Sequence, residues 1–414
     1  MPSAARITAV SPAARRIAVR LRCCECRLLP LVVLIGLLTG GGAAQTEPAA
    51  SSELSPRSCR PTPATLRCVA RKAGIRLGVG HEAGVPADDR LVAREFDLLT
   101  LEGSLLWSVV HPEPDRWDFT GADRSIAWAR RHRLRVTATH FVWDQILYQS
   151  TPAWVKQVSD PARLRAVMAN HLGTISRRYG RGIARWIVVN EPLRYVGDTA
   201  ALQDNHFSRV LGPDWIAETF RIARRAAPRA RLWLNEVFTE VDAAKARALV
   251  ELARSLVSRG VPVHGVGLEG HLFTNFLQPT APRPEVLRET LRELAGLGLQ
   301  VSFTEIDAPT FPETPDRLAE QARRVRALVE LCLEVRRCKS LTFWNLHDGR
   351  SWLNSLFRRS DLAPTLFDAS LRPKPVYFSV REALRDCRAA RRREADHCGR
   401  RGPALRRTRI RSRS

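Results

Sequence analysis

The stretch Trp186-Ile187-Val188-Val189-Asn190-Glu191-Pro192 decides the fold of this 414-residue chain. Its apolar part has the length of a buried strand, and a polar pair follows directly. A second run, Val301-Ser302-Phe303-Thr304-Glu305-Ile306-Asp307, ends in the same way. A closed parallel barrel brings the ends of all its strands to one mouth. We therefore expect Glu191 and Glu305 to meet there despite their separation in sequence.

Strand-like and helix-like segments alternate along the middle of the chain. Eight short apolar runs are predicted as strands: 76–79, 98–101, 135–138, 187–189, 232–234, 266–268, 301–303 and 341–343. Helix patterns lie between them, such as 123–133, 161–179, 215–227, 243–259, 283–297 and 315–333. Eight βα units predict an α/β fold, namely a (β/α)8 TIM barrel that forms a single catalytic domain over residues 74–380.

The first 44 residues are expected to be a secretory signal peptide. Basic residues precede an apolar stretch from Leu28 to Leu38, and small residues follow as far as Ala44. This stretch is too short to span a membrane, although the long basic leader leaves an uncleaved anchor as the alternative. Residues 45–73 are then a Pro/Ser-rich linker or N-terminal extension, and the protein is expected to be secreted.

Cysteine usage agrees with export. Three of the nine cysteines fall within the signal peptide, and an even number remains, which permits disulfides. These are Cys59, Cys68, Cys332, Cys338, Cys387 and Cys398. No zinc-like spacing of Cys and His follows the signal peptide, so we expect neither a metal nor a cofactor.

The net charge of +24 is concentrated at the ends of the chain. Residues 381–414 carry thirteen Arg against four acidic residues and almost no apolar side chains, so they are expected to form a basic disordered tail. Weak contact with an anionic surface is possible for such a tail. Nucleic acid is not expected, because no aromatic residues are interleaved and the chain is exported. The alternative is that Cys387 or Cys398 ties the tail to the barrel through Cys59 or Cys68.

Two carboxylates at one mouth suggest glycoside hydrolysis. That reaction needs one protonated acid for the leaving oxygen and one ionised carboxylate for the anomeric carbon. A series of motifs then follows in order: His111 to Pro114 with Trp117 to Phe119, Phe141 to Trp143, Thr151 to Trp154, Trp186 to Pro192, Gly265 to Leu272, Thr304 to Asp307, Trp344 with Trp352, and residues 364–375. With this series the chain resembles glycoside hydrolase family 10, the endo-β-1,4-xylanase family, over about residues 74–378.

The resemblance implies a role for each matching residue. Glu191 corresponds to the acid/base and Glu305 to the nucleophile of a retaining reaction. Asn190 matches the residue that binds the sugar 2-hydroxyl, and His271 and Asp307 match the pair that orients the nucleophile. The implied substrate-binding residues are Glu102, Trp143, Glu269, Trp344 and Trp352, and Cys332 with Cys338 matches a disulfide common in the family.

Several positions depart from the family pattern. Gly103 and Leu106 stand where the family has a sugar-binding Asn and Lys. Thr139 and Asp144 replace two His, so that only a backbone shift would let His140 substitute. Glu269 replaces a Gln and adds a third carboxyl, which is expected to raise one carboxyl pKa by repulsion between like charges.

Three functional hypotheses remain. The first is a secreted retaining β-glycosidase, most simply a monomer, that hydrolyses β-1,4-linked polysaccharide, with xylan as the family default. The second is the same fold acting on a different β-linked glycan or glycoconjugate. The third is a carbohydrate-binding or adhesive protein without catalysis.

Overall fold

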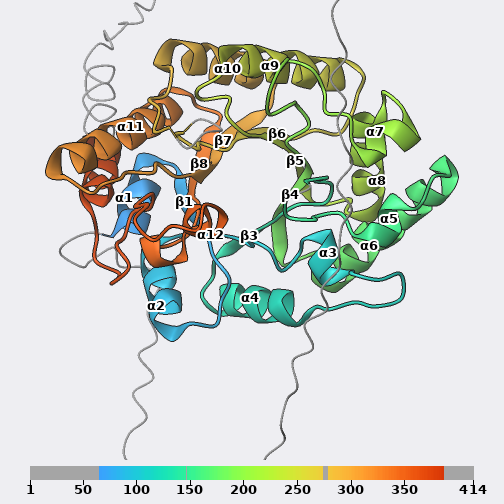
Figure 1. Cartoon of the computed structure of the whole chain (residues 1–414), viewed down its shortest axis with the longest axis horizontal. Coiled ribbons are helices and arrows are strands. Elements are labelled where there is room, and N and C mark those ends of the chain that lie inside the picture. Colours follow the sequence, from blue (N-terminus) through green and yellow to red (C-terminus); the bar gives the residue numbers. More distant parts are fainter. Residues whose placement is uncertain (1–64, 146, 274–277, 387–414) are drawn as a thin grey trace, which may run out of the picture. The chain divides into compact units, whose positions relative to one another are not determined.

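The computed structural model describes residues 65–145, 147–273 and 278–386, which form a closed barrel of eight parallel strands (Figure 1). The strands pair in chain order, and β1 closes the barrel against β8. Their bounds are β1 (Arg76–Gly80), β2 (Leu98–Thr100), β3 (Arg135–Ala138), β4 (Ile183–Asn190), β5 (Arg231–Glu236), β6 (Gly265–Leu268), β7 (Gln300–Ile306) and β8 (Cys338–Phe343). The predicted TIM barrel is confirmed.

Helices surround the strands (Figure 1). The six helices predicted from sequence are present as α4 (Thr120–Arg131), α6 (Pro161–Tyr179), α8 (Trp215–Ala226), α9 (Ala243–Ser258), α10 (Pro284–Gly296) and α11 (Pro315–Glu334). Further helices are α1 (Leu66–Ala73), α2 (Pro86–Glu95), α3 (Trp107–Val110), α5 (Ala153–Lys156), α7 (His206–Leu211), η1 (Asp348–Arg350) and α12 (Trp352–Leu356). Polar caps fix several helix starts. Thr314, for example, accepts from the backbone N–H of Arg317 beside a proline in the first turn of α11.

Both predicted domain boundaries need correction. Helix α1 lies within the segment 45–73 that the sequence assigned to a linker or N-terminal extension, and it buries Leu66, Val69 and Ala70 at helical spacing. At the other end, residues 375–386 are helical and bury Val380 and Leu384, so the first six residues of the predicted tail belong to the fold. The signal peptide and the rest of the tail lie outside the described residues.

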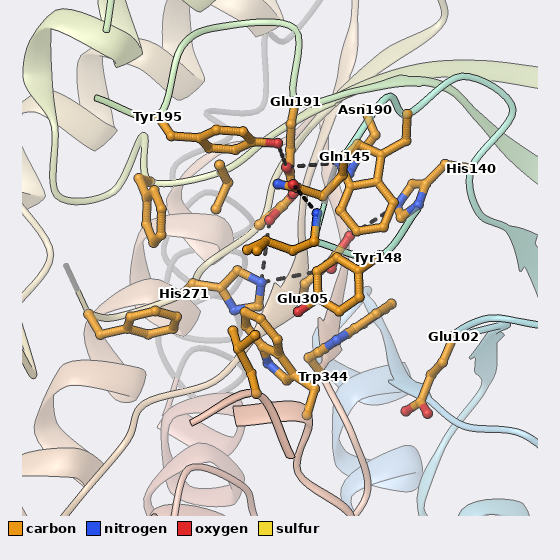
Figure 2. Close-up of a pocket in the computed structure, with 18 of the residues that line it drawn as sticks. Glu102, His140, Gln145, Tyr148, Asn190, Glu191, Tyr195, His271, Glu305 and Trp344 are labelled. Atoms are coloured by element: carbon orange, nitrogen blue, oxygen red, sulfur yellow. Dashed lines mark hydrogen bonds and ion pairs between the residues drawn. The ribbon is translucent and has the colours of Figure 1, made fainter. Parts of the chain in front are cut away.

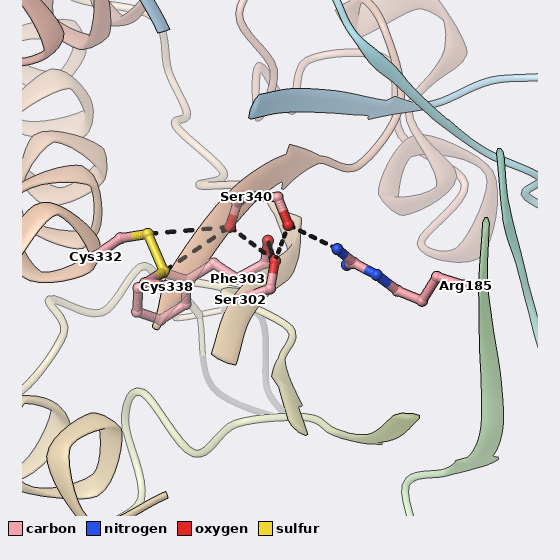
Figure 3. Close-up of a disulfide and its surroundings, with 6 residues drawn as sticks. All are labelled: Arg185, Ser302, Phe303, Cys332, Cys338 and Ser340. Atoms are coloured by element: carbon pink, nitrogen blue, oxygen red, sulfur yellow. Dashed lines mark hydrogen bonds between the residues drawn. A yellow bond between two sulfur atoms is a disulfide. The ribbon is translucent and has the colours of Figure 1, made fainter. Parts of the chain in front are cut away.

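One disulfide joins α11 to β8. Cys332 and Cys338 are bonded, with their Cα atoms 5.3 Å apart, as the resemblance implied (Figure 3). Behind it, the Ser302 hydroxyl on β7 donates to the Ser340 carbonyl on β8 at 2.7 Å. Arg185 reaches across the barrel to the Ser340 hydroxyl at 2.8 Å. Cys68 is buried, and Cys59, Cys387 and Cys398 lie outside the described residues.

Close packing inside the barrel depends on a glycine in β6. A Cβ on Gly267 would lie 2.0 Å from Oδ1 of Asn235 on β5, so any larger residue would displace that amide. Asn235 is fully buried at the carboxyl end of β5, where the functional side chains gather. In the part of the chain that the structure describes, no helix has both the length and the apolar character needed to cross a membrane.

Candidate active site

The carboxyl ends of the strands surround a cavity of about 530 Å³. Glu191 follows the last residue of β4, and Glu305 lies in β7, one residue before its end. Both line this cavity, as the sequence predicted from their positions at strand ends (Figure 2). The structure therefore brings together two acids that are far apart in the chain.

One carboxylate oxygen of Glu191 accepts two hydrogen bonds from neighbouring side chains. Nε1 of Trp143 donates to its Oε2 at 2.9 Å, and the hydroxyl of Tyr195 donates to the same oxygen. Nε2 of Gln203 donates to the backbone carbonyl of Glu191 at 2.8 Å. The backbone of Glu191 has a φ of 49°, a conformation that non-glycine residues adopt rarely. These contacts fix the direction in which the carboxyl group points.

Glu305 lies deeper, at 5% exposure. Nδ2 of Asn235 donates to its Oε1 at 3.0 Å, and Nε2 of His140 lies 3.7 Å from the same oxygen. Nε2 of His271 lies 3.8 Å from Oε2. Nitrogen atoms of Asn235, His140 and His271 therefore lie on both sides of the Glu305 carboxyl group.

A third carboxyl, Glu269, lies beside Glu305. Nε2 of His271 is 3.3 Å from its Oε2, and Nδ2 of Asn235 donates to its Oε1 at 3.0 Å. Burial raises the pKa of Glu269 well above its usual range, and the charges of Glu305 and Glu191 raise it further. The expected repulsion between like charges is therefore present, and burial is the larger cause.

A chain of polar groups orients His271. Its Nδ1 lies 2.8 Å from Oδ1 of Asp307, and Nε1 of Trp352 donates to Oδ2 of Asp307 at 2.7 Å. Burial lowers the pKa of His271, but Asp307 and Glu269 more than offset this, and the pKa ends well above the usual histidine value. Nε2 of His271 lies between Oε2 of Glu269, at 3.3 Å, and Oε2 of Glu305, at 3.8 Å.

Asn235 is a central residue of the site that the sequence analysis missed. Its Nδ2 also donates to Oδ1 of Asn190 at 2.8 Å, and its Oδ1 accepts from the hydroxyl of Thr304 at 2.6 Å. A signal was available, because Asn235 and Glu236 directly follow the predicted strand 232–234, just as Asn190 and Glu191 follow the predicted strand 187–189. Tyr195, Gln203 and Tyr148 were also missed, and they lie in loops that carry no such signal.

At the β2 end of the cavity, Glu102 accepts from Nδ2 of Asn345 at 2.7 Å. Burial raises the pKa of Glu102 to about 7, although the bond from Asn345 opposes the rise. Leu106 lines the cavity here and contributes no polar atom, and a Cβ on Gly103 would meet no atom within 4 Å. The space at positions 103 and 106, where the family pattern has Asn and Lys, is therefore open at Gly103 and apolar at Leu106.

The other predicted substrate residues also line the cavity, namely Trp143, Glu269, Trp344 and Trp352. Thr139 turns away, and its hydroxyl donates to the Leu101 carbonyl. Asp144 pairs with Lys156 at 2.9 Å outside the cavity. His140 does line the cavity, and both of its ring nitrogens are buried without a hydrogen-bond partner in the described residues.

One group of side chains has the geometry to hold a cation. A carboxylate oxygen of Glu269, one of Glu305 and a ring nitrogen of His271 all lie within 4.8 Å of one another. The hydrogen bond from His271 to Asp307 resembles the outer contact of many metal-bound histidines. The same atoms serve the pair of acids described above, so a cation here would compete with any substrate.

The chain belongs to glycosyl hydrolase family 10, whose model matches residues 65–383. It is 30% identical to endo-1,4-beta-xylanase 5 of Pyricularia oryzae over 77% of this chain and 78% of the relative. It is also 30% identical to endo-1,4-beta-xylanase 2 of Aureobasidium pullulans, over 71% of this chain and 81% of the relative. Among solved structures, native xylanase 10B of Thermotoga maritima superposes with a TM-score of 0.71 at 27% identity, over 79% of this chain and 99% of that one. The protein is thus a glycoside hydrolase with the fold expected for its family.

Proposed function

We propose that this protein is a secreted retaining β-glycosidase that hydrolyses β-1,4-linked polysaccharide, with xylan as the expected substrate because its relatives are named xylanases. One observation carries the proposal. Glu191 and Glu305 line a single cavity, and each is held by its own donors, Trp143 and Tyr195 for the first and Asn235 for the second.

In the first step, Glu305 attacks the anomeric carbon while Glu191 donates a proton to the glycosidic oxygen, and the leaving sugar departs. A covalent glycosyl-enzyme forms on Glu305. In the second step, Glu191 removes a proton from water, and the water oxygen displaces Glu305 from the anomeric carbon. The deeper position of Glu305 is consistent with a carboxylate that attacks the anomeric carbon of the bound sugar.

The supporting roles follow from the contacts. Because Oδ1 of Asn190 accepts from Asn235, its amide N–H groups remain for the sugar 2-hydroxyl. His271, held by Asp307, orients Glu305 from the other side. The remaining residues are proposed to bind sugar, the aromatic ones by stacking on pyranose faces and the acids by accepting from hydroxyls: Trp143, Trp344, Trp352, Glu102 and Glu269.

Secretion is supported by the signal-like residues 1–44 and by the disulfide between Cys332 and Cys338, since disulfides persist in oxidising compartments. A different β-linked glycan is the second candidate. It is favoured by Leu106 and Gly103, which leave the β2 end of the cavity without the polar contacts expected for a xylan chain.

The test combines variants with a substrate panel of β-1,4-xylans, glucans and mannans. Glu305→Gln should abolish turnover of every active substrate, whereas Glu191→Ala should spare aryl glycosides, whose leaving groups need no protonation. Glu313→Gln, an exposed loop residue, is the control and should leave activity unchanged. Near-normal activity of Glu305→Gln would refute the mechanism. Binding to a glycan without any hydrolysis would instead favour a non-catalytic role.

A further inference from the structure

The walls of the cavity are apolar, whereas its floor is polar. Among the described residues that line it, none is a lysine or an arginine. Its acids already accept hydrogen bonds from protein groups, as Glu102 does from Asn345 and Glu191 from Tyr195. Most of the lining residues are apolar or aromatic, among them Leu106, Trp143, Val196, Phe238 and Trp344.

Exposed apolar side chains gather at the mouth of this cavity. Eight large hydrophobic residues are exposed in the described part of the chain, and five of them line the cavity: Leu147, Tyr148, Val196, Leu356 and Phe357. They come from separate segments after β3, β4 and β8, and Leu356 is the last residue of α12. Such clustering marks a surface that binds an apolar ligand, because scattered exposure would need no explanation.

The two catalytic acids divide the cavity into halves. Glu191 protonates the leaving group, so residues beside it face that group. Val196 follows Tyr195, which donates to Glu191, and Phe238 lies just beyond the end of the neighbouring strand β5. Trp344 lies after β8, which is opposite β4 in the closed barrel. The half that receives the leaving group is therefore walled by apolar side chains.

Tyr148 narrows the space above the acids. Its ring centroid lies 5.3 Å from that of Trp143, which follows β3, and 6.4 Å from that of Trp352, which follows β8. Figure 2 shows Tyr148 among the residues that line the cavity with Glu191 and Glu305. The cavity volume of about 530 Å³ falls in the range of small-molecule pockets, roughly 300–1,000 Å³. A long polysaccharide would have to pass this constriction.

We propose that the preferred substrate is a short β-glycoside whose leaving group is an apolar aliphatic or aromatic alcohol. The inference rests on the proposed function, because Glu191 and Glu305 define the two halves. Glu305 forms a bond to the anomeric carbon, and the bond from that carbon to the leaving oxygen breaks with its electron pair on oxygen. That oxygen takes the proton of Glu191, and the apolar alcohol departs. Water then releases the sugar and restores both acids.

The test compares three substrates whose leaving groups all need protonation: n-hexyl β-xylobioside, methyl β-xylobioside and xylotriose. We expect kcat/KM for the hexyl compound to exceed the other two by about tenfold or more, since apolar contacts of this size discriminate by roughly 10–200-fold. Val196→Ser should reduce this preference several-fold through a higher KM for the hexyl compound. Val109→Ser is the matched control, because Val109 is 46% exposed and Val196 65%, and Val109 does not line the cavity.

The outcomes separate the two proposals. If xylotriose is cleaved as fast as the hexyl compound, or faster, and Glu305→Gln abolishes this activity, the inference about the leaving group is wrong and the proposed function stands. If none of the three compounds nor an aryl β-xylobioside is cleaved, both are overturned. A hexyl preference that survives Val196→Ser and Phe238→Ser together would also refute the inference.

Discussion

Replacing Lys245 by Met should destabilise the protein by removing the partner of a buried acid. Lys245 lies in the first turn of α9, and its Nζ is 3.0 Å from Oε1 of Glu236, with exposures of 1% and 0%. The same ammonium donates to the Arg194 carbonyl at 3.2 Å, and Oε2 of Glu236 accepts from the N–H of Leu193 at 2.9 Å. This pair therefore anchors the segment that follows Glu191.

The magnitude follows from the pKa of Glu236. Burial raises that pKa from 4.5 to about 7, although Lys245 opposes the rise. A difference of about 2.5 corresponds to roughly 3 kcal/mol at 1.36 kcal/mol per pKa unit. Without Lys245 the pKa rises further, and breaking a buried ion pair typically costs about 3–5 kcal/mol. Because the folded pKa of the parent is already about 7, Glu236 is protonated in both folded proteins well below that value, so the pH-dependent part of this cost is absent at pH 5 and grows as pH rises through the folded pKa of the parent.

Urea unfolding at pH 5 and pH 8 is the assay. We expect Lys245→Met to lose about 3–5 kcal/mol at pH 8 and clearly less at pH 5. The double variant Lys245→Met/Glu236→Gln should recover most of the loss, because the Gln carbonyl still accepts from the Leu193 N–H. The exposed Lys72→Met is the matched control and should stay within about 0.5 kcal/mol of the parent. Equal losses at the two pH values would refute the reasoning.

Two further predictions concern the cavity. Glu269→Gln removes a buried acid whose folded pKa is raised, so that ionisation of this acid destabilises the parent as pH rises. The Tm of the variant, measured by differential scanning calorimetry, should therefore increase relative to the Tm of the parent between pH 5 and pH 8. A constant difference between the two Tm values across this range would contradict the prediction. The double change Gly103→Asn/Leu106→Lys supplies polar groups at the β2 end. It should raise kcat/KM on xylotriose by about tenfold or more, since a hydrogen bond to a charged group contributes about 1.5–3 kcal/mol. An unchanged or lower kcat/KM would show that the β2 end of the cavity binds a group other than a xylose residue.

The meeting of Glu191 and Glu305 in one cavity could be predicted from sequence because both residues lie at the ends of strands. Each short apolar run had to be buried, and the polar residues that follow it had to reach the shared mouth. This argument located Glu191 and Glu305, and the resemblance to the family added Asn190, His271 and Asp307. Applied to the run 232–234, the same argument would also have found Asn235.

The walls of the cavity could not be predicted in this way. Leu147, Val196 and Phe357 lie in loops, and nothing in their local sequence tells a buried apolar residue from an exposed one. The boundaries failed for a related reason. The helix at Leu66–Ala73 is short and follows a Pro/Ser-rich stretch, and its apolar face gains stability only by packing against the barrel.

The polar residues around Asn235 at the base of the cavity and the apolar residues at its mouth are therefore under different physical constraints. Asn235 contacts Glu305, Glu269 and Asn190 at once, and Gly267 leaves room for it, so a change at either position would disturb the whole polar floor. Val196 is 65% exposed, and substitution there removes little packing. Sequence change at exposed wall residues such as Val196 can thus occur at small cost in stability while Glu191 and Glu305 stay in place. A cavity that holds Glu191 and Glu305 together with the apolar Leu106 and the open space at Gly103 is the pattern that this separation permits.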